Sequence, residues 1–259
     1  MRSPLGYTRK MLLQSALLRG REGLAHAFTT REGGVSVGSL SSLNLGMQPG
    51  ENEASLHQNW ARVLEGIGAP SAPLATVQQV HGKQVLSGDE GRGPLAPVGE
   101  GDALVTTVPG AMVAVRVADC VPILLAGEGL AAAVHAGWRG TVQDIARVAL
   151  QAACERADLA PGRVDAAIGP CIRVCCYEVG PEVVQGLDEL GVPRDCFLRD
   201  GDKPHVDLVA ANRWLLESAG IGEVDVVGGC TFCDERFFSH RREGPGTGRM
   251  AGIVGWLAC

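Results

Sequence analysis

Short apolar runs separated by turn residues dominate the pattern of hydrophobic and polar positions along the chain. Runs of this length, bounded by glycine, proline or polar residues, predict β-strands. Pro122 places one of these strands at a sheet edge or puts the proline at the strand's start. The predicted strands are 103–108, 112–117, 121–125, 130–134, 164–168 and 224–227, and extended chain is also expected at 77–80, 85–86, 253–254 and 256–257.

Three later segments carry apolar side chains at the spacing of one helix face. Each begins at a residue that is typical of a helix N-terminus, and two of them end at a glycine. In the first segment, we expect Thr141 to cap a helix whose face carries Ile145, Ala149 and Ala152. The other two segments run from Pro181 to Gly191 and from Asp207 to Gly220.

Strands and helices mix along the chain without strict alternation, which predicts an α/β or α+β protein. We expect one domain over residues 1–259, with a mixed β-sheet. The apolar stretch 11–18 is short and has no small-residue cleavage site, so we interpret it as the start of a helix or strand instead of a signal peptide. The alternative that residues 1–20 form a loosely attached N-terminal segment stays open.

Composition and charge narrow the classes of function. The chain is 46% hydrophobic and 20% charged, with a formal net charge of -6. This acidic balance disfavours nucleic acid as a partner, because a phosphate backbone requires clustered lysine and arginine. No run approaches the roughly 18 apolar residues that a membrane helix needs. We therefore expect a cytoplasmic protein with no membrane partner, acting on a small molecule; partner proteins are left open.

Three segments place a possible metal ligand beside a turn that follows apolar chain. The ligands are His81, Cys120 and His135. Imidazole and thiolate suit Zn²⁺, and three protein ligands leave the fourth tetrahedral position free, as in catalytic zinc sites that activate water. The spacing is not a compact motif, however. On these residues alone, two buried histidines and one core cysteine are the favoured interpretation.

A series of ordered segments resembles one known family over nearly the whole chain. That family is the laccase-domain family, first described as multicopper polyphenol oxidases and later as purine nucleoside phosphorylases and peptidoglycan editing factors. The segments are AFTTREGGVS at 27–36, SLNLG at 42–46, QVHG at 79–82, GDA at 101–103, ADCVP at 118–122, HAGWRG at 135–140, IGPC at 168–171, CYEV at 176–179, FFSHRR at 237–242 and TGR at 247–249.

The resemblance implies a mixed sheet with flanking helices and a zinc site whose His, Cys and His fall on His81, Cys120 and His135. It also implies purine nucleoside chemistry. The expected reactions are phosphorolysis of adenosine, inosine, guanosine and methylthioadenosine, and deamination of adenosine. The partners are then a purine nucleoside and phosphate, and the cofactor is zinc, with copper the less favoured metal.

Two acidic residues are candidates for catalytic roles in this chemistry. Deamination requires an acid/base group near the attacking water. Asp119 and Asp102 are both candidates for that group, or for a role in orienting a ligand histidine. For Asp102, an ordinary turn or strand-start residue is an equally good interpretation.

Phosphorolysis requires an anion site, and guanidinium groups bind phosphate through a planar fork. The candidates are Arg31, Arg139 and Arg242; Arg139 precedes the predicted helix, whose N-terminus also favours anions. The ordinary alternative for each of them is a surface arginine. Asn44 is a candidate for binding ribose or base, or it shapes the turn before Gly46.

The chain has nine cysteines, and their odd number favours buried thiols or metal ligands over disulfides in a chain of this length. Cys230 and Cys233 form a C-x-x-C pair, which together with Cys171, Cys175 and Cys176 allows a second, all-cysteine zinc site. The partner half is not C-x-x-C, so ordinary thiols are the favoured interpretation.

Three other functions stay open. A copper oxidase acting on phenols is disfavoured, because the chain has only six histidines and no His-x-His pair for a multicopper centre. A zinc-dependent amidase that edits wrongly built peptidoglycan precursors would use the same ligands as the nucleoside enzyme. A non-catalytic interaction module would hold zinc through a fourth protein ligand.

Overall fold

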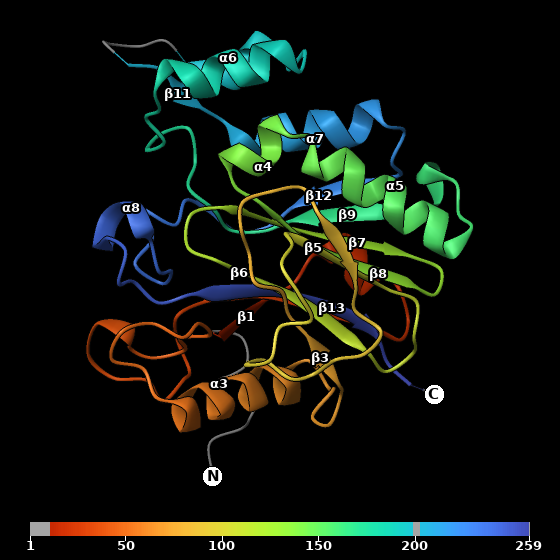
Figure 1. Cartoon of the computed structure of the whole chain (residues 1–259), viewed down its shortest axis with the longest axis vertical. Coiled ribbons are helices and arrows are strands. Elements are labelled where there is room, and N and C mark those ends of the chain that lie inside the picture. The colour runs from red at the N-terminus through yellow and green to blue at the C-terminus, as the bar shows by residue number, and fades with distance from the viewer. Residues whose placement is uncertain (1–10, 199–202, 259) are drawn as a thin grey trace.

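The structure is a computed structural model that describes residues 11–198 and 203–258. Two mixed β-sheets pack face to face, and helices cover the outer face of each sheet (Figure 1). The chain therefore forms four layers in the order helix, sheet, sheet, helix. This arrangement confirms the predicted α/β class and the single domain of mixed sheet and helices. The strands divide between two large sheets instead of forming one.

The first sheet has five strands in the order β1-β2-β13-β6-β3. Its pairings are antiparallel except for the parallel pair of β3 and β6. The bounds are β1 Leu12–Leu13, β2 Leu24–Thr29, β13 Met250–Trp256, β6 Met112–Val117 and β3 Leu74–Ala75. The C-terminal strand β13 therefore lies in the middle of this sheet, between chain segments that are far away in sequence.

The second sheet has six strands in the order β12-β9-β7-β8-β5-β4. Both end pairings are parallel and the inner ones are antiparallel. Pro122 lies at the start of β7 in the interior of this sheet, so the sheet-edge alternative is wrong and the strand-start alternative is confirmed. The bounds are β12 Val224–Val226, β9 Asp165–Ile168, β7 Val121–Gly127, β8 Leu130–Ala136, β5 Ala103–Thr106 and β4 Val85–Ser87; a separate pair is formed by β10 Phe197–Leu198 and β11 His205–Val206.

Helix α3, Glu53–Gly66, covers the outer face of the five-stranded sheet. Asn52 caps it by accepting a hydrogen bond from the backbone N–H of Ser55. Its buried positions, which include Leu56 and Trp60, recur at helical spacing and pack on that sheet. Our sequence-based prediction does not contain this helix, although its cap and its apolar spacing are both readable.

Four helices lie on the other side of the molecule. Helices α5 and α7 pack on the six-stranded sheet, and α6 packs against α4 farther out (Figure 1). These helices are α4 Trp138–Val142, α5 Ile145–Ala157, α6 Pro181–Glu189 and α7 Leu208–Ser218. The remaining short elements are α2 Ala16–Arg19, α8 His240–Glu243 and the 3-10 turns Gly38–Leu40, Pro161–Arg163 and Arg194–Cys196.

The predicted helix cap at Thr141 is wrong. Thr141 lies inside α4, where its hydroxyl donates to the carbonyl of Gly137 four residues earlier. The chain then breaks at Asp144, which has a left-handed backbone (φ 67°) and immediately precedes α5. Two short helices therefore replace the single helix that the apolar spacing predicts. By contrast, α6 begins at Pro181 and α7 is capped by Asp207 as predicted.

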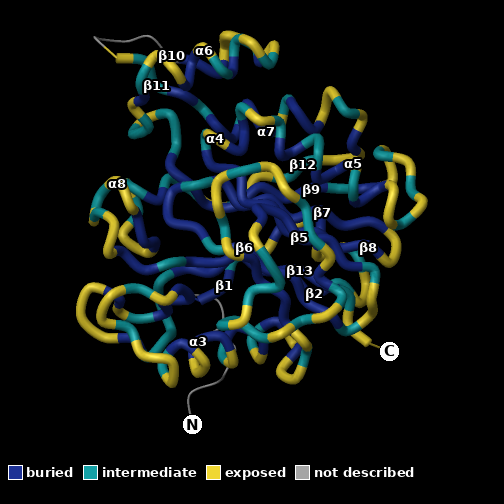
Figure 2. The backbone as a smooth tube through the Cα atoms, in the orientation of Figure 1, coloured by how far each residue is buried: buried dark blue, intermediate teal, exposed yellow. Residues whose placement is uncertain are grey.

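Three apolar clusters fill the spaces between the layers, and the buried backbone is concentrated in the two sheets (Figure 2). The cluster between the sheets includes Phe28, Val115 and Leu124. Close packing on both faces fixes the strand ends in space. The rim at which β6 ends, β7 begins and β8 ends is consequently a rigid support for side chains.

The described part of the N-terminal segment is packed against the body of the protein. Leu12 pairs with Thr29 in the five-stranded sheet, and Leu18 is fully buried in the core between the sheets. Residues 11–20 are therefore attached, whereas residues 1–10 lie outside the described residues. Among the described residues, no helix is both long enough and apolar enough to cross a membrane.

Candidate metal centre and pocket

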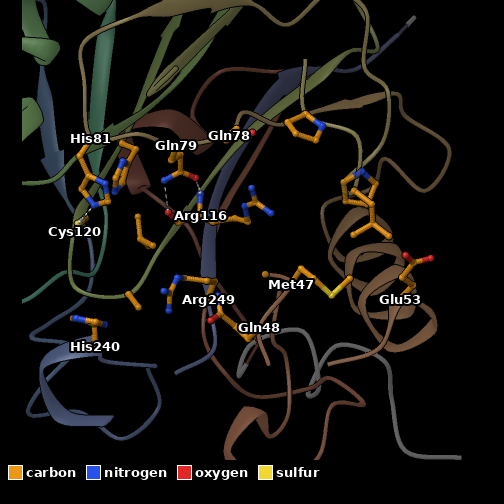
Figure 3. A pocket seen from close by; sticks show the side chains of 17 residues that line it. Met47, Gln48, Glu53, Gln78, Gln79, His81, Arg116, Cys120, His240 and Arg249 are labelled. Carbon is orange, nitrogen blue, oxygen red and sulfur yellow. Dashed lines mark hydrogen bonds between the residues drawn. The ribbon is translucent and has the colours of Figure 1, made fainter. Parts of the chain in front are cut away.

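The structure brings His81, Cys120 and His135 together at the rim of the two sheets. Their possible ligand atoms all lie within 4.8 Å of one another, and the Cys120 Sγ is 4.0 Å from the His81 Nε2 (Figure 3). The two imidazole rings meet edge to face, with centroids 4.8 Å apart. Three residues that lie 39 and 15 positions apart in the sequence thus form one group that can hold a metal ion, called the metal group below.

Backbone geometry explains how the three residues converge. Cys120 lies on the turn that links β6 of one sheet to β7 of the other, and Asp119 beside it has a left-handed backbone (φ 85°). His135 is the penultimate residue of β8, where it pairs with Pro122 of β7. His81 approaches from a separate loop and is itself left-handed (φ 60°). Non-glycine residues adopt this conformation rarely, and when they do it is often at functional sites.

Asp102 fixes the orientation of two of the three ligands. Its carboxylate lies 2.8 Å from the His135 Nδ1 and also accepts hydrogen bonds from the backbone N–H groups of His81 and Gly82, at 3.0 and 2.7 Å. Burial raises the pKa of Asp102, but the hydrogen bonds from His135 and from these N–H groups have the larger opposite effect. The pKa of Asp102 therefore lies below its usual value. An ionised Asp102 behind Nδ1 directs the His135 Nε2 towards the other ligands.

The electrostatics of the group favour the ligand form of Cys120. Burial raises the pKa of this thiol, but the adjacent His135 and His81 imidazoles outweigh it and lower the pKa to about 6. Burial likewise lowers the pKa of His135, yet Cys120 and Asp102 raise it to about 9. Both shifts favour a thiolate on Cys120 and a proton on His135, and a metal ion would replace that proton.

Gly137 allows the close approach of the ligands. A Cβ atom at this position would lie 3.0 Å from the Cys120 Sγ and 3.1 Å from the His81 Cδ2. Its φ of −70° is ordinary, so space and not backbone conformation is what requires glycine here. The glycine in the segment HAGWRG therefore has a physical role beside the metal group.

The metal group lies at one end of a pocket of about 760 Å³. Figure 3 shows His81 and Cys120 at that end, with Gln79, Arg116, Arg249 and His240 near them and with Met47 and Glu53 at the far side. The volume is typical of a site for a small molecule.

Two arginines that the sequence-based argument did not select contribute to this pocket. The Arg116 side chain donates to the carbonyl of Val77, and Arg249 donates to the carbonyls of Thr247 and Gly248. Burial lowers the pKa of both guanidinium groups, and the positive charge of Arg249 lowers that of Arg116 further. In the part of the chain that the structure describes, neither arginine forms an ion pair with a carboxylate.

The three predicted phosphate ligands lie outside the pocket lining. Arg31 pairs with Glu243 and stacks on Phe238. Arg242 donates to three backbone carbonyls and also pairs with Glu243. Arg139 is exposed and stacks on its neighbour Trp138. The structure thus assigns structural contacts to two of these arginines and does not bring any of the three to the metal group.

Asn44 and Asp119 also lie behind the pocket lining. Both polar atoms of the Asn44 side chain bind the chain around Gly46, and its Oδ1 also accepts from the Arg249 backbone N–H. The Asp119 carboxylate accepts from Thr231, Ser239 and the Arg241 backbone N–H. Asn44 therefore supports the strand end that carries Arg249, and Asp119 ties the C-terminal segment to the turn of Cys120.

Fold and site together define a layered α/β chain with a His–Cys–His group at the head of an arginine-lined pocket. Residues 25–257 match the sequence model of the family described as multi-copper polyphenol oxidoreductase laccase, and the chain belongs to this family. The resemblance inferred from the sequence is thereby confirmed.

Curated relatives and solved structures agree with this assignment. The chain is 40% identical to a purine nucleoside phosphorylase of Deinococcus radiodurans, over 89% of this chain and 88% of the relative. It is 36% identical to purine nucleoside phosphorylase YlmD of Geobacillus stearothermophilus, over 90% of each. The crystal structure of that YlmD superposes with a TM-score of 0.85 at 33% identity, and covers 96% of this chain and 99% of the other.

Proposed function

We propose that the protein is a zinc-dependent purine nucleoside phosphorylase. The expected substrates are adenosine, inosine, guanosine and methylthioadenosine, which phosphate cleaves to a free purine and a pentose 1-phosphate. The names of the relatives support this proposal. The observation that carries it is the pair of half-buried arginines, Arg116 and Arg249, which face the same pocket as the metal group and have no carboxylate partner among the described residues.

Even partial burial of a guanidinium group without a counter-ion is unfavourable, because burial penalises an unpaired charge. A bound phosphate would supply the missing negative charge and accept several charge-assisted hydrogen bonds. Arg249 also neighbours His240 and Cys120 in the pocket (Figure 3). Phosphate held by Arg116 and Arg249 would consequently lie beside the metal group, where the ribose C1′ has to be placed for attack.

The opposite part of the pocket suits the purine. Figure 3 shows Met47 and Glu53 there, and the apolar residues Pro94, Leu95 and Pro97 also line the pocket. Apolar walls with a few polar groups are typical of sites for heteroaromatic ligands. We propose that the base lies against these side chains.

The ligand set fits zinc. One thiolate and two imidazoles, with the His135 Nδ1 already bonded to Asp102, are ligands that a tetrahedral Zn²⁺ site uses, and they leave one position for a substrate or water. A zinc ion bound there would supply a Lewis acid at the head of the pocket. The same site is our proposed location for adenosine deamination.

The test is to incubate the zinc-loaded protein with inosine, with and without phosphate, and to measure hypoxanthine. We expect release that depends on phosphate and that is lost in Cys120→Ala, while Arg213→Gln, an exposed arginine paired with Glu217 on α7, retains it. Adenosine then distinguishes phosphorolysis, which gives adenine, from deamination, which gives inosine. A zinc-containing protein that releases no base from any of the four nucleosides would refute the proposal.

A further inference from the structure

Four cysteines form a second cluster away from the pocket. Cys175 and Cys176 are adjacent in sequence, and Cys230 and Cys233 form a C-x-x-C pair on another turn. Their sulfur atoms all lie within 4.8 Å of one another. Among the described residues, this cluster and the His–Cys–His group are the two groups of His, Cys, Asp and Glu that are arranged to hold a metal ion.

The sulfur–sulfur distances are those of a metal site. The Cys176 Sγ lies 3.5 Å from the Cys175 Sγ and 3.3 Å from the Cys233 Sγ, and the Cys175 and Cys233 sulfurs are 3.9 Å apart. Four sulfurs around Zn²⁺, each with a bond of about 2.3 Å, are about 3.8 Å apart at the edges of a tetrahedron. A disulfide would require one pair at about 2.05 Å. All four cysteines are free thiols in the structure.

The backbone around Cys230 supports a thiolate. The backbone N–H of Arg173 donates a hydrogen bond to the Cys230 Sγ over 3.4 Å. The two turns are also joined, because Cys171 and Cys230 form an isolated parallel β-bridge. N–H donors to sulfur stabilise ligated thiolates and fix their direction. The turns are thus preorganised, whereas an accidental group of surface thiols would lack this support.

We propose that Cys175, Cys176, Cys230 and Cys233 bind a structural zinc ion. When Zn²⁺ binds, the coordinating thiols release up to about four protons to solvent. The product is a zinc tetrathiolate centre with a net charge of about −2. Four protein ligands close the coordination shell, so this zinc ion has no position for a substrate. The site is independent of the metal group in the pocket and of the proposed catalytic function.

The position of the cluster indicates what this zinc ion stabilises. Thr231, inside the C-x-x-C turn, donates a hydrogen bond to Asp119, which precedes the pocket ligand Cys120. Arg242 of α8 donates to the carbonyls of Thr231 and Phe232. The zinc ion would therefore hold the segment that carries α8, and with it His240, against the rim of the pocket.

The test begins with the zinc content of the full chain purified under reducing conditions. We expect Cys176→Ser combined with Cys233→Ser to lose one equivalent of zinc per chain relative to the wild type. His81→Ala is expected to lose a different equivalent, and both losses should add when the variants are combined. The matched control is Cys154→Ser, a buried thiol of α5 outside the cluster, which should keep the wild-type content. An unchanged zinc content in the Cys176/Cys233 variant would refute the proposal.

A second measurement on the wild type does not depend on the folding of a variant. Alkylation of the native protein, mapped by mass spectrometry, should spare the four cysteines while zinc is bound and modify them after chelation. Exposed Cys175 and Cys233 make this contrast large, because a free thiol at either position is accessible. Equal alkylation before and after chelation, a Cys176–Cys233 disulfide in the purified protein, or iron in place of zinc would each overturn the proposal.

Discussion

The Asp102 carboxylate lies 2.8 Å from the Nδ1 of His135, and both side chains are almost completely excluded from solvent. The same carboxylate holds the backbone of the His81 loop. Asp102 thus acts on the metal group from behind, without lining the pocket. Its contacts are those of a residue that orients ligands, which is one of the two roles that the sequence suggests for it.

Asp102→Asn is therefore expected to weaken metal binding. Asparagine retains an acceptor but loses the charge that fixes His135, and the loss of such a partner commonly costs about 10-fold to 100-fold in metal affinity. Competition with a chromophoric chelator measures this change. The matched control is Asp165→Asn, because Asp165 on β9 is also a carboxylate in an ion pair, here with Arg21. This variant should bind metal normally. Unchanged affinity in Asp102→Asn would show that the carboxylate has no role in ligation.

The pair Arg116 and Arg249 gives a prediction about phosphate. Each of the substitutions Arg116→Gln and Arg249→Gln removes a charge-assisted contact worth about 1.5–3 kcal/mol, so we expect the KM for phosphate to rise about 10-fold to 100-fold. The KM for the nucleoside should change much less. Steady-state kinetics with phosphate and nucleoside varied separately provide the measurement.

Arg139→Gln provides the comparison for this experiment, because Arg139 is a sequence-based candidate that lies outside the pocket lining. We expect its phosphate dependence to match that of the wild type. A strong effect of Arg139→Gln together with no effect of Arg249→Gln would move the phosphate site away from the pocket. In that case the unpaired charges of Arg116 and Arg249 would need another explanation.

The sequence predicts the strands better than the site. Runs such as 112–117 and 121–125 become β6 and β7 because short apolar segments between turns have few alternatives in a layered protein. The division into two sheets is not readable, since it depends on β13 inserting between β2 and β6. The break at Asp144 is also invisible to a periodicity argument, because it depends on one left-handed residue.

The spacing of His81, Cys120 and His135 does not by itself predict that the three residues form one site. That prediction came from the family resemblance. The pocket arginines were missed for a physical reason. Arg116 and Arg249 come from β6 and from the residue before β13, and only long-range strand pairing makes them neighbours. One local signal was available, since Arg116 is the single charged residue in the apolar strand Met112–Val117.

Gly137→Ala tests the close packing of the metal group. The added Cβ would lie 3.0 Å from the Cys120 Sγ, and at least one ligand would have to move by a few tenths of an ångström. We expect reduced metal affinity and a loss of stability of about 1–3 kcal/mol, which is usual for overpacking. Gly246→Ala is the control, because a Cβ there has no heavy atom within 4 Å. Metal titration and urea unfolding give the two measurements, and normal metal affinity would mean that the site tolerates the shift.

Because His26 is buried, we expect the folded protein to become less stable in mild acid. It is fully buried in β2, where its Nε2 accepts a hydrogen bond from the Ser15 N–H and its Nδ1 has no hydrogen-bond partner among the residues that the structure describes. Burial lowers the pKa of His26 to about 4, well below its usual value. The unfolded chain therefore binds more protons between about pH 6.5 and pH 4, and the free energy of unfolding falls as the pH is lowered through this window.

The expected loss from His26 is about 3 kcal/mol across that window, since each pKa unit corresponds to about 1.4 kcal/mol. Urea unfolding of the wild type and of His26→Gln at several pH values measures it, because other groups that titrate in the same range cancel in the difference. We expect a shallower pH dependence in His26→Gln, whereas His57→Gln, which removes an exposed histidine of α3, should follow the wild type. Parallel curves for the wild type and His26→Gln would mean that folding does not shift the pKa of His26.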